Sequence, residues 1–356
     1  MYSGDSENKI SVKILPVMIS PVAIVMFLLF IFYDLPKPAA HKAKSLATAP
    51  ENIASEKDPS LYWQAPDIDN IPVAETKQQI AYGKDLIAHT ALYFGPHGSV
   101  SKISNGLNCQ NCHLQAGTAV YGNNYGSVAS LYPKFRARSG SFENIYKRVN
   151  DCFIRSLNGH AIDTTGREMQ AITAYINFLG SNVKKGEKAA GSGFKELAFM
   201  DSAANPQKGK AVYIVRCQSC HQQNGDGLIK PDSSEYIYPA LWGSHSFNDG
   251  AGLYRLGNMA KFIKYNMPQG ISFKIPMLSD EEAWNVAAFI AVQPRPHKAV
   301  PKDWPDKSAK PLDHPFGPYA DSFTARQHKL GPFKPIVTAQ QQREQTAKNI
   351  KATPGR

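Results

Sequence analysis

The sequence predicts an all-α protein with two tandem helical domains, an N-terminal apolar segment and an extended C-terminal tail. Two observations support this prediction. A short Cys/His motif occurs twice, as Cys109–His113 and Cys217–His221, with enough chain between the copies for a separate domain around each. An amphipathic helical pattern follows each copy. The predicted order is an apolar segment (1–33), a tether (34–60), a first domain (61–185), a second domain (194–293) and a tail (294–356).

Each copy of the motif reads C-x-x-C-H, the attachment signature of a c-type haem. The two cysteines form thioether bonds to the haem vinyl groups, and the histidine is the proximal iron ligand. A redox disulfide or half of a zinc site would not need the histidine or the second full copy. The sequence therefore predicts two covalently bound haem c groups. Their attachment residues are Cys109, Cys112, Cys217 and Cys220, and their proximal ligands are His113 and His221.

Composition narrows the range of partners. The net charge of +11 suits anionic partners, but no basic helix or aromatic-basic stripe is present, so we expect no nucleic-acid binding. The hydrophobic fraction of 42% is ordinary for a globular protein. Four of the five cysteines belong to the haem motifs, which leaves Cys152. Haem attachment of this type takes place outside the cytoplasm, which predicts a periplasmic protein, and an unassigned cysteine there requires an explanation.

Residues Ile14 to Tyr33 form an uncharged apolar run, preceded by Lys9 and Lys13. The run is long enough to span a bilayer and exceeds the usual core of a signal peptide. We expect an uncleaved anchor in the cytoplasmic membrane, with the lysines on the cytoplasmic side. A cleaved signal peptide, which would leave a free periplasmic protein, is the alternative. The following tether is rich in Ala, Lys and Pro.

The two domains share a plan. Helical spacing around Gly83 and around Gly209 precedes the motifs, although Gly83 lies 26 residues before its motif and Gly209 only 8, so the first domain contains an insertion. An amphipathic helix closes each domain: one over 168–179, ended by Gly180, and one over 279–290. In the second helix Ser279 is an N-cap with a glutamate at the capping-box position. This order of helix, haem motif and helix is that of a class I cytochrome c domain.

The distal iron ligand of such a domain comes from the loop before the final helix. In the second domain Met267 lies there, within Asn-Met-Pro and shortly before Ser279. Methionine ligation raises the potential of a haem and suits electron transfer. Met259 and Met277 are the competing methionines.

The first domain has no Met-Pro in the corresponding interval, and Met169 falls within the helical pattern. Cys152 is the only soft ligand there, and thiolate ligation would lower the potential of the first haem. His160 is the alternative ligand, and a buried cysteine that only fills the core is the plainer interpretation.

The sequence resembles the dihaem thiosulfate dehydrogenases, which couple two thiosulfates into tetrathionate. The resemblance runs from about Tyr62 to Ile336 and includes GLNCQNCHLQAGT, RVNDCFIRSLNG, LWGSHSFNDGAG, NMP, DHPFGPY and GPFKPI. It implies His/Cys ligation at the active-site haem, matching His113 and Cys152. It also implies active-site roles at the matching positions Arg138, Arg148 and Ser156. Some relatives have a lysine where this chain has Asn266, which favours plain His/Met ligation of the second haem.

The chemistry of thiosulfate agrees with this resemblance. Joining two dianions requires charge neutralisation, for which arginine forks are well suited. Four arginines lie close together in the sequence around Cys152: Arg136, Arg138, Arg148 and Arg155. Two haems can accept the two released electrons and pass them to a small periplasmic acceptor such as a cytochrome c. Two rivals remain: a pure electron carrier, and a sulfur-oxidation subunit that binds a sulfur carrier protein.

Overall fold

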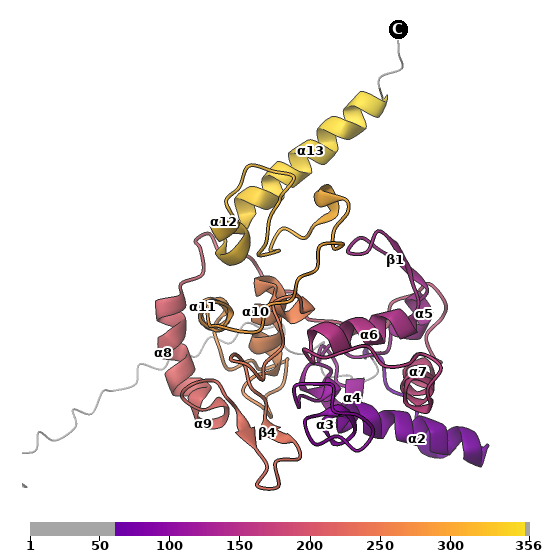
Figure 1. Ribbon diagram of the computed structural model, residues 1–356. Helices are drawn as coiled ribbons and strands as arrows, with labels where there is room; N and C mark the ends of the chain where they lie inside the picture. Colours follow the sequence, from indigo (N-terminus) through magenta and orange to yellow (C-terminus); the bar gives the residue numbers. More distant parts are fainter. Residues whose placement is uncertain (1–60, 353–356) are drawn as a thin grey trace, which may run out of the picture. The chain divides into compact units, whose positions relative to one another are not determined.

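The computed structural model describes residues 61–352 (Figure 1). The predicted anchor (14–33) and the tether (34–60) lie outside the described residues. Within 61–352, no helix is both long and apolar enough to cross a membrane.

The first domain contains six α-helices among the described residues, and each contributes to the core or to the haem site. They are α2 (Ala74–Ala88), α3 (Thr90–Phe94), α4 (Leu114–Gly117), α5 (Val128–Leu131), α6 (Ile145–Arg155) and α7 (Arg167–Leu179). A two-stranded antiparallel ribbon joins α5 to α6 and pairs β1 (Lys134–Arg136) with β2 (Ser141–Glu143).

The second domain has the predicted helical plan. Its helices are α8 (Pro206–Arg216), α9 (Gln218–His221), α10 (Leu256–Asn266) and α11 (Asp280–Ala291). A ribbon of β3 (Leu228–Ile229) and β4 (Tyr236–Tyr238) follows the haem motif. Ser279 caps α11 and forms the predicted capping box with Glu282. The fold is therefore helix-rich with two cytochrome c domains, and the two small ribbons are the departure from the all-α prediction.

In both domains the first helix crosses the last one at a glycine. A Cβ added to Gly83 of α2 would lie 2.0 Å from the carbonyl oxygen of Ala171 on α7. A Cβ added to Gly209 of α8 would lie 1.9 Å from the carbonyl oxygen of Asn285 on α11. Only glycine allows the backbones to approach this closely. The insertion that separates Gly83 from its motif therefore leaves the helix crossing unchanged (Figure 1).

The tail differs from the extended segment that the sequence predicted. It runs without an α-helix from 294 to 324, but then forms α12 (Ala325–Leu330) and α13 (Lys334–Ala352). The prediction gave too much weight to the prolines. Pro335 occupies the first turn of α13, where proline is tolerated, and the following Gln, Arg, Lys and Ala residues are good helix formers.

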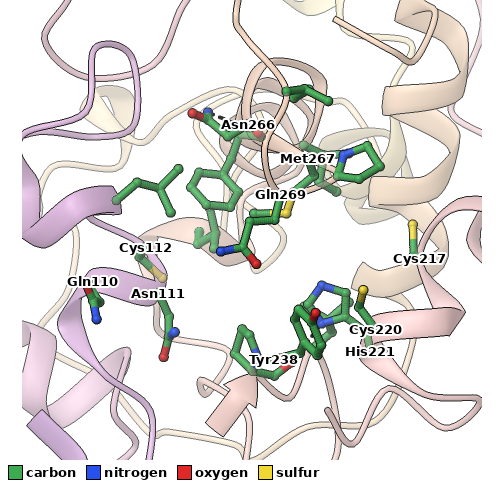
Figure 2. A pocket seen from close by; sticks show the side chains of 18 of the residues that line it. Gln110, Asn111, Cys112, Cys217, Cys220, His221, Tyr238, Asn266, Met267 and Gln269 are labelled. Atoms are coloured by element: carbon green, nitrogen blue, oxygen red, sulfur yellow. Dashed lines mark hydrogen bonds between the residues drawn. The ribbon is translucent and has the colours of Figure 1, made fainter. Parts of the chain in front are cut away.

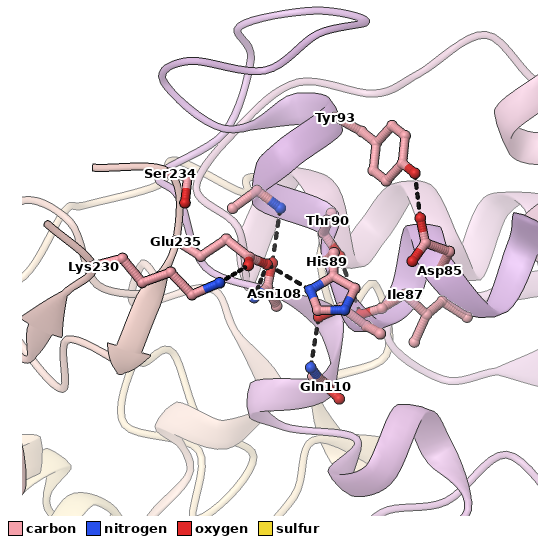
Figure 3. A network of polar contacts seen from close by, with 12 residues as sticks. Asp85, Ile87, His89, Thr90, Tyr93, Asn108, Gln110, Lys230, Ser234 and Glu235 are labelled. Carbon is pink, nitrogen blue, oxygen red and sulfur yellow. Dashed lines mark hydrogen bonds and ion pairs between the residues drawn. The ribbon is translucent and has the colours of Figure 1, made fainter. Parts of the chain in front are cut away.

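The hairpin of the second domain enters the core of the first. Tyr236, 8% exposed, belongs to the same apolar cluster as Phe153 and Tyr175 of the first domain. Beside it, the buried carboxylate of Glu235 accepts hydrogen bonds from His89 Nδ1 at 2.9 Å, Asn108 Nδ2 at 3.1 Å and Lys230 Nζ at 2.7 Å (Figure 3). Asn108 immediately precedes Cys109. This polar network therefore joins the second domain to the first haem motif.

Candidate haem and anion sites

The first haem motif begins in a tight turn that its neighbours hold in place. Cys109 starts a 3-10 turn that ends at Asn111, and its backbone N–H donates to Thr90 Oγ1 at 3.0 Å. Thr90 is fully buried and itself donates to the carbonyl of Leu86 at 2.8 Å. Burial raises the pKa of the Cys109 and Cys112 thiols to about 12. Both attachment cysteines are partly buried, as thiols that face a bound haem would be.

Both motif histidines have the tautomer that an iron ligand needs. His113 Nδ1 lies 2.6 Å from the carbonyl oxygen of Asn123, and His221 Nδ1 lies 2.9 Å from that of Pro239. A carbonyl can only accept, so each Nδ1 donates its proton and each Nε2 keeps a free lone pair. Burial lowers the pKa of His113 to about 4 and also lowers that of His221. Each imidazole is therefore neutral, and these residues fit a haem iron.

A cavity of about 720 Å³ surrounds the second motif (Figure 2). Cys217, Cys220 and His221 line one side, and Met267 faces them from the end of α10. The cavity is apolar in most of its lining and large enough for a planar macrocycle. Two thiols, an imidazole and a facing thioether are the donor set of a covalently bound haem with His/Met ligation.

The competing methionines differ from Met267 in position. Met277 is 51% exposed and is not part of the cavity lining. Met259 also lines the cavity, but it is only 3% exposed and packs in the apolar core from the middle of α10. Met267 ends that helix, and its backbone N–H donates to Ile263 at 3.0 Å. This fixed helix end directs Met267 towards the cavity (Figure 2).

Asn266 has a structural role that its sequence position did not indicate. Its side-chain amide donates to the carbonyl of Phe262 at 3.2 Å and to that of Tyr121 in the first domain at 3.3 Å. The residue before Met267 therefore links the second haem site to the loop that follows the first motif.

The unassigned cysteine lies on α6 beside a partly buried cation. Arg148 Nη1 donates to Cys152 Sγ at 3.3 Å, across one helical turn. A thiolate at Cys152 is the largest cause that raises the pKa of Arg148. It also adds to the raised pKa of Cys109 and Cys112, so Cys152 lies near the first haem motif. His160, the alternative ligand, is exposed and lies beyond the end of α6.

The other residues predicted for the site lie close to this helix. Ser156 is the C-cap of α6, and its backbone N–H donates to the carbonyl of Cys152 at 2.8 Å. Arg138, in the turn between β1 and β2, donates from Nη1 to the carbonyl of Gly250 at 3.3 Å. Arg155 Nη1 reaches the same carbonyl at 3.4 Å. The charges of Arg136, Arg148 and Arg155 all act on Arg138, so the four arginines form one cationic cluster.

A loop of the second domain supports the end of α6, and the motifs alone did not reveal it. Asn248 is fully buried and donates from Nδ2 to the carbonyl of Ile154 and to Asn158 Oδ1, both at 2.9 Å. Its backbone N–H donates to the carbonyl of Arg155 at 3.1 Å. The segments LWGSHSFNDGAG and RVNDCFIRSLNG therefore bind each other. Their joint presence in the sequence was the available signal.

Sequence reasoning also missed two tail residues. Asp303 forms a two-pronged ion pair with Arg155, at 2.9 Å from Nη1 and 2.8 Å from Nη2. The backbone N–H of Trp304 donates to the carbonyl of Arg138 at 2.6 Å. Both lie within the part of the chain that resembles the thiosulfate dehydrogenases, which was the only sequence signal for them.

Comparison with known proteins identifies the family of each domain. Residues 99–184 match the SoxA/TsdA cytochrome c domain model, and residues 206–293 match the cytochrome c model. The thiosulfate dehydrogenase of Psychrobacter arcticus is 34% identical over 275 residues, covering 76% of this chain and 79% of that protein. That of Allochromatium vinosum is 33% identical over 246 residues, covering 68% of this chain and 87% of that protein.

A solved structure, the as-isolated thiosulfate dehydrogenase (TsdBA) from Marichromatium purpuratum, superposes with a TM-score of 0.62 at 28% identity. The match covers 67% of this chain and 50% of that one, so this chain spans half of its length. Fold, sites and matches together define a dihaem c-type cytochrome with two covalently bound haem c groups. The chain belongs to the thiosulfate dehydrogenase family.

Proposed function

We propose that this chain is a thiosulfate dehydrogenase, which oxidises two thiosulfates to one tetrathionate and passes two electrons to an external acceptor. One observation supports this most directly. Arg148 Nη1 lies 3.3 Å from the Cys152 sulfur, in a chain 34% identical to a thiosulfate dehydrogenase. A pure electron carrier needs neither this sulfur nor the arginine cluster beside it.

The arginines bind and orient the substrate. Thiosulfate is a dianion, and two of them repel each other as their sulfurs approach. Arg148 lies on α6 one turn before Cys152, and Arg138 belongs to the same cationic cluster from the β1–β2 turn. Guanidinium forks held in partly buried positions neutralise such charge more strongly than water does. Ser156, one turn after Cys152, adds a hydroxyl at the same helix end.

Cys152 supplies the reacting sulfur, and between turnovers its thiolate would help to hold the first haem. Its thiolate and the terminal sulfur of one thiosulfate form a sulfur–sulfur bond, with loss of two electrons. The terminal sulfur of a second thiosulfate then attacks the bound one, which releases tetrathionate and restores the thiolate. Arg148 stabilises the thiolate at each end of this cycle. The two haems, when bound, each take up one of the two electrons.

Met267 and His221 hold the second haem as an electron-transfer centre. Their thioether and imidazole donors favour a high potential, which directs electrons away from the first haem. The acceptor that this favours is a small periplasmic protein such as a cytochrome c.

A steady-state assay tests this function. Purified protein with both haems should reduce ferricyanide in the presence of thiosulfate and form one tetrathionate for every two electrons. Reduction of the haems by a physiological electron donor, with no thiosulfate turnover, would favour the pure electron carrier.

We propose a periplasmic location with residues 14–33 as a membrane anchor. Support comes from haem attachment outside the cytoplasm and from the uncharged apolar run over this range. Cell fractionation checks this: the protein should sediment with membranes and be released by protease treatment of spheroplasts. A free periplasmic form with a new N-terminus after residue 40 would show a cleaved signal peptide instead.

A further inference from the structure

We propose that Asp303, from the C-terminal tail, is a positioning residue of the thiosulfate site, because it holds Arg155 and leaves Arg138 free to bind an anion. This inference rests on the proposed function. It adds to the site a residue that lies far after Cys152 in the chain, beyond both haem domains.

The ion pair of Asp303 is well formed and shielded. Its two carboxylate oxygens accept from Arg155 Nη1 at 2.9 Å and Nη2 at 2.8 Å, which is the fork geometry of a strong pair. Arg138 Nε lies 3.9 Å from the same carboxylate. The side chains of Asp303, Arg155 and Arg138 are 14%, 10% and 16% exposed. Water therefore screens these interactions only weakly.

The two residues that follow Asp303 in the tail pack against the turn between β1 and β2, which contains Arg138. The N–H of Trp304 donates to the carbonyl of Arg138, and the guanidinium carbon of Arg138 lies 5.6 Å from the centre of the Trp304 ring. Gly140 packs so closely on Pro305 that an added Cβ would lie 2.6 Å from its Cγ. The position of Asp303 relative to Arg138 is therefore fixed by backbone contacts and not by the ion pair alone.

Charge explains why a carboxylate is needed at this position. Arg138 and Arg155 both donate to the carbonyl of Gly250, so two guanidinium groups share one neutral acceptor. Like charges this close repel, and desolvation adds to the cost of keeping both charged. Asp303 is the one carboxylate among the charged groups that act most strongly on Arg138. Its negative charge allows both arginines to stay charged and close together.

The carboxylate also divides the roles of the two arginines. Asp303 occupies both terminal nitrogens of Arg155, one of which also donates to Gly250. The buried Nε of each arginine has no hydrogen-bond partner within the described part of the chain. Arg138 gives Nη1 to Gly250, and its Nε lies 3.9 Å from Asp303, so its Nη2 is the terminal nitrogen of the pair that remains available to an anion. Without Asp303, Arg155 would be released and would push Arg138 out of this alignment.

Asp303→Asn tests the inference, because it removes the charge and keeps the shape. We expect the KM for thiosulfate to rise about tenfold while haem content stays at two per chain. A role in folding alone would lower the active fraction and leave KM unchanged. Asp303→Glu keeps the charge but moves it by one methylene, and its KM should rise about threefold. If Asp303→Asn does not accumulate as folded protein, the KM of Asp303→Glu tests the inference instead, and an unchanged KM there would overturn it.

Asp313→Asn is the matched control. Asp313 is another buried tail carboxylate that pairs with an arginine, Arg255, at 2.6 Å, and also accepts from the N–H of Gly257 at 3.0 Å. Its loss should lower the melting temperature and leave the KM for thiosulfate unchanged. An equal rise of KM in Asp313→Asn would show that general tail docking, not Asp303, is responsible. An unchanged KM in Asp303→Asn would overturn the inference. A lower KM would also overturn it, because it would show that the greater positive charge of the site, and not the alignment of Arg138, controls substrate binding.

A second measurement does not depend on turnover. Dithionate, S2O6²⁻, is an inert dianion that resembles the sulfonate ends of tetrathionate, and it should raise the melting temperature of the wild-type holoprotein. This shift should fall by more than half in Asp303→Asn and remain in Asp313→Asn. A wild-type protein that binds dithionate in this way but does not oxidise thiosulfate would contradict the proposed function and leave the inference supported. An equal shift in wild type and Asp303→Asn would overturn the inference.

Discussion

Gly83 and Gly209 occupy corresponding positions in the two domains, each at the crossing of the first and last helices. Their distances to the following haem motif differ, at 26 and 8 residues, yet an added Cβ would lie about equally close to the opposing backbone, at 2.0 and 1.9 Å. A backbone atom cannot move aside as the end of a side chain can. The helix crossing therefore constrains both positions to glycine.

We expect Gly83→Ala and Gly209→Ala each to lower the free energy of unfolding by at least about 1–3 kcal/mol, as overpacking does. Denaturant titration of the holoprotein, followed by far-UV circular dichroism, measures this. Gly252→Ala is the control, because a Cβ there would meet no atom within 4 Å, and its stability should stay within about 0.5 kcal/mol of wild type. Wild-type stability in either crossing variant would contradict the close approach.

Cys152→Gly should keep both haems and the fold but reduce thiosulfate oxidation to below about one per cent, because the reacting sulfur is lost. The absorbance of the first haem should change as well, since its distal ligand is removed. Haem quantification and ferricyanide reduction check the two parts of the prediction. Substantial turnover with both haems present would make Cys152 a bystander and favour the electron-carrier function.

Arg148→Ala should lower kcat/KM for thiosulfate by about 10- to 150-fold, which corresponds to about 1.5–3 kcal/mol for a charged hydrogen bond. Arg138→Ala should have a similar effect. Arg148→Lys should restore little of the activity, since an ammonium group cannot form the planar fork. Lys147→Ala is a control on the same helix, because Lys147 is half exposed and pairs with Asp151 instead. Equal losses in Lys147→Ala and Arg148→Ala would contradict a specific role.

Met267→Ala should abolish the methionine-to-iron charge-transfer band at the red end of the oxidised spectrum. It should also slow electron exit, while thiosulfate binding at the first haem stays near the wild-type level. Met277→Ala should leave the band intact, because Met277 is 51% exposed and outside the cavity. Loss of the band in Met277→Ala instead would show that the ligand assignment is wrong.

The contact of Glu235 with His89 and Lys230 should make stability depend on pH. Burial alone would raise the pKa of Glu235, but hydrogen bonds and charges from Lys230 and His89 outweigh it and hold the pKa below its ordinary value of 4.5. A lowered pKa stabilises the fold above the unfolded value, and this contribution is lost as the pH falls through the folded value.

Glu235→Gln should therefore be less stable than wild type at neutral pH, and the difference should shrink as the pH falls below about 4.5. Denaturant titrations of both proteins at a series of pH values measure this. Ser234→Ala is a neighbouring control, since Ser234 hydrogen-bonds Asp232 and not the network. A difference between wild type and Glu235→Gln that stays constant to low pH would exclude the ion pairs as its cause.

The sequence predicted the parts of this molecule that local patterns encode. Each haem motif is one contiguous stretch of sequence, and the closing helices have clear amphipathic spacing. Ser279 is of a residue type that is preferred at the N-cap of a helix. Glu235, Asn248 and Asp303 were not predicted, because each acts on residues far away in the chain and has an ordinary local context. The helix α13 was missed for the opposite reason, since nearby prolines hid a sequence that favours a helix on its own.

Asp303 contacts Arg138, in the turn between β1 and β2, but it is synthesised long after that turn. The ribosome completes both haem motifs well before it reaches this residue, so a chain cut short near residue 300 would already contain every attachment cysteine and every proposed iron ligand. A haem stain detects only the thioether bonds at those cysteines, so a stained fragment would still lack the carboxylate that arranges Arg138 and Arg155. Colour alone is therefore a poor test of whether this protein has been made completely.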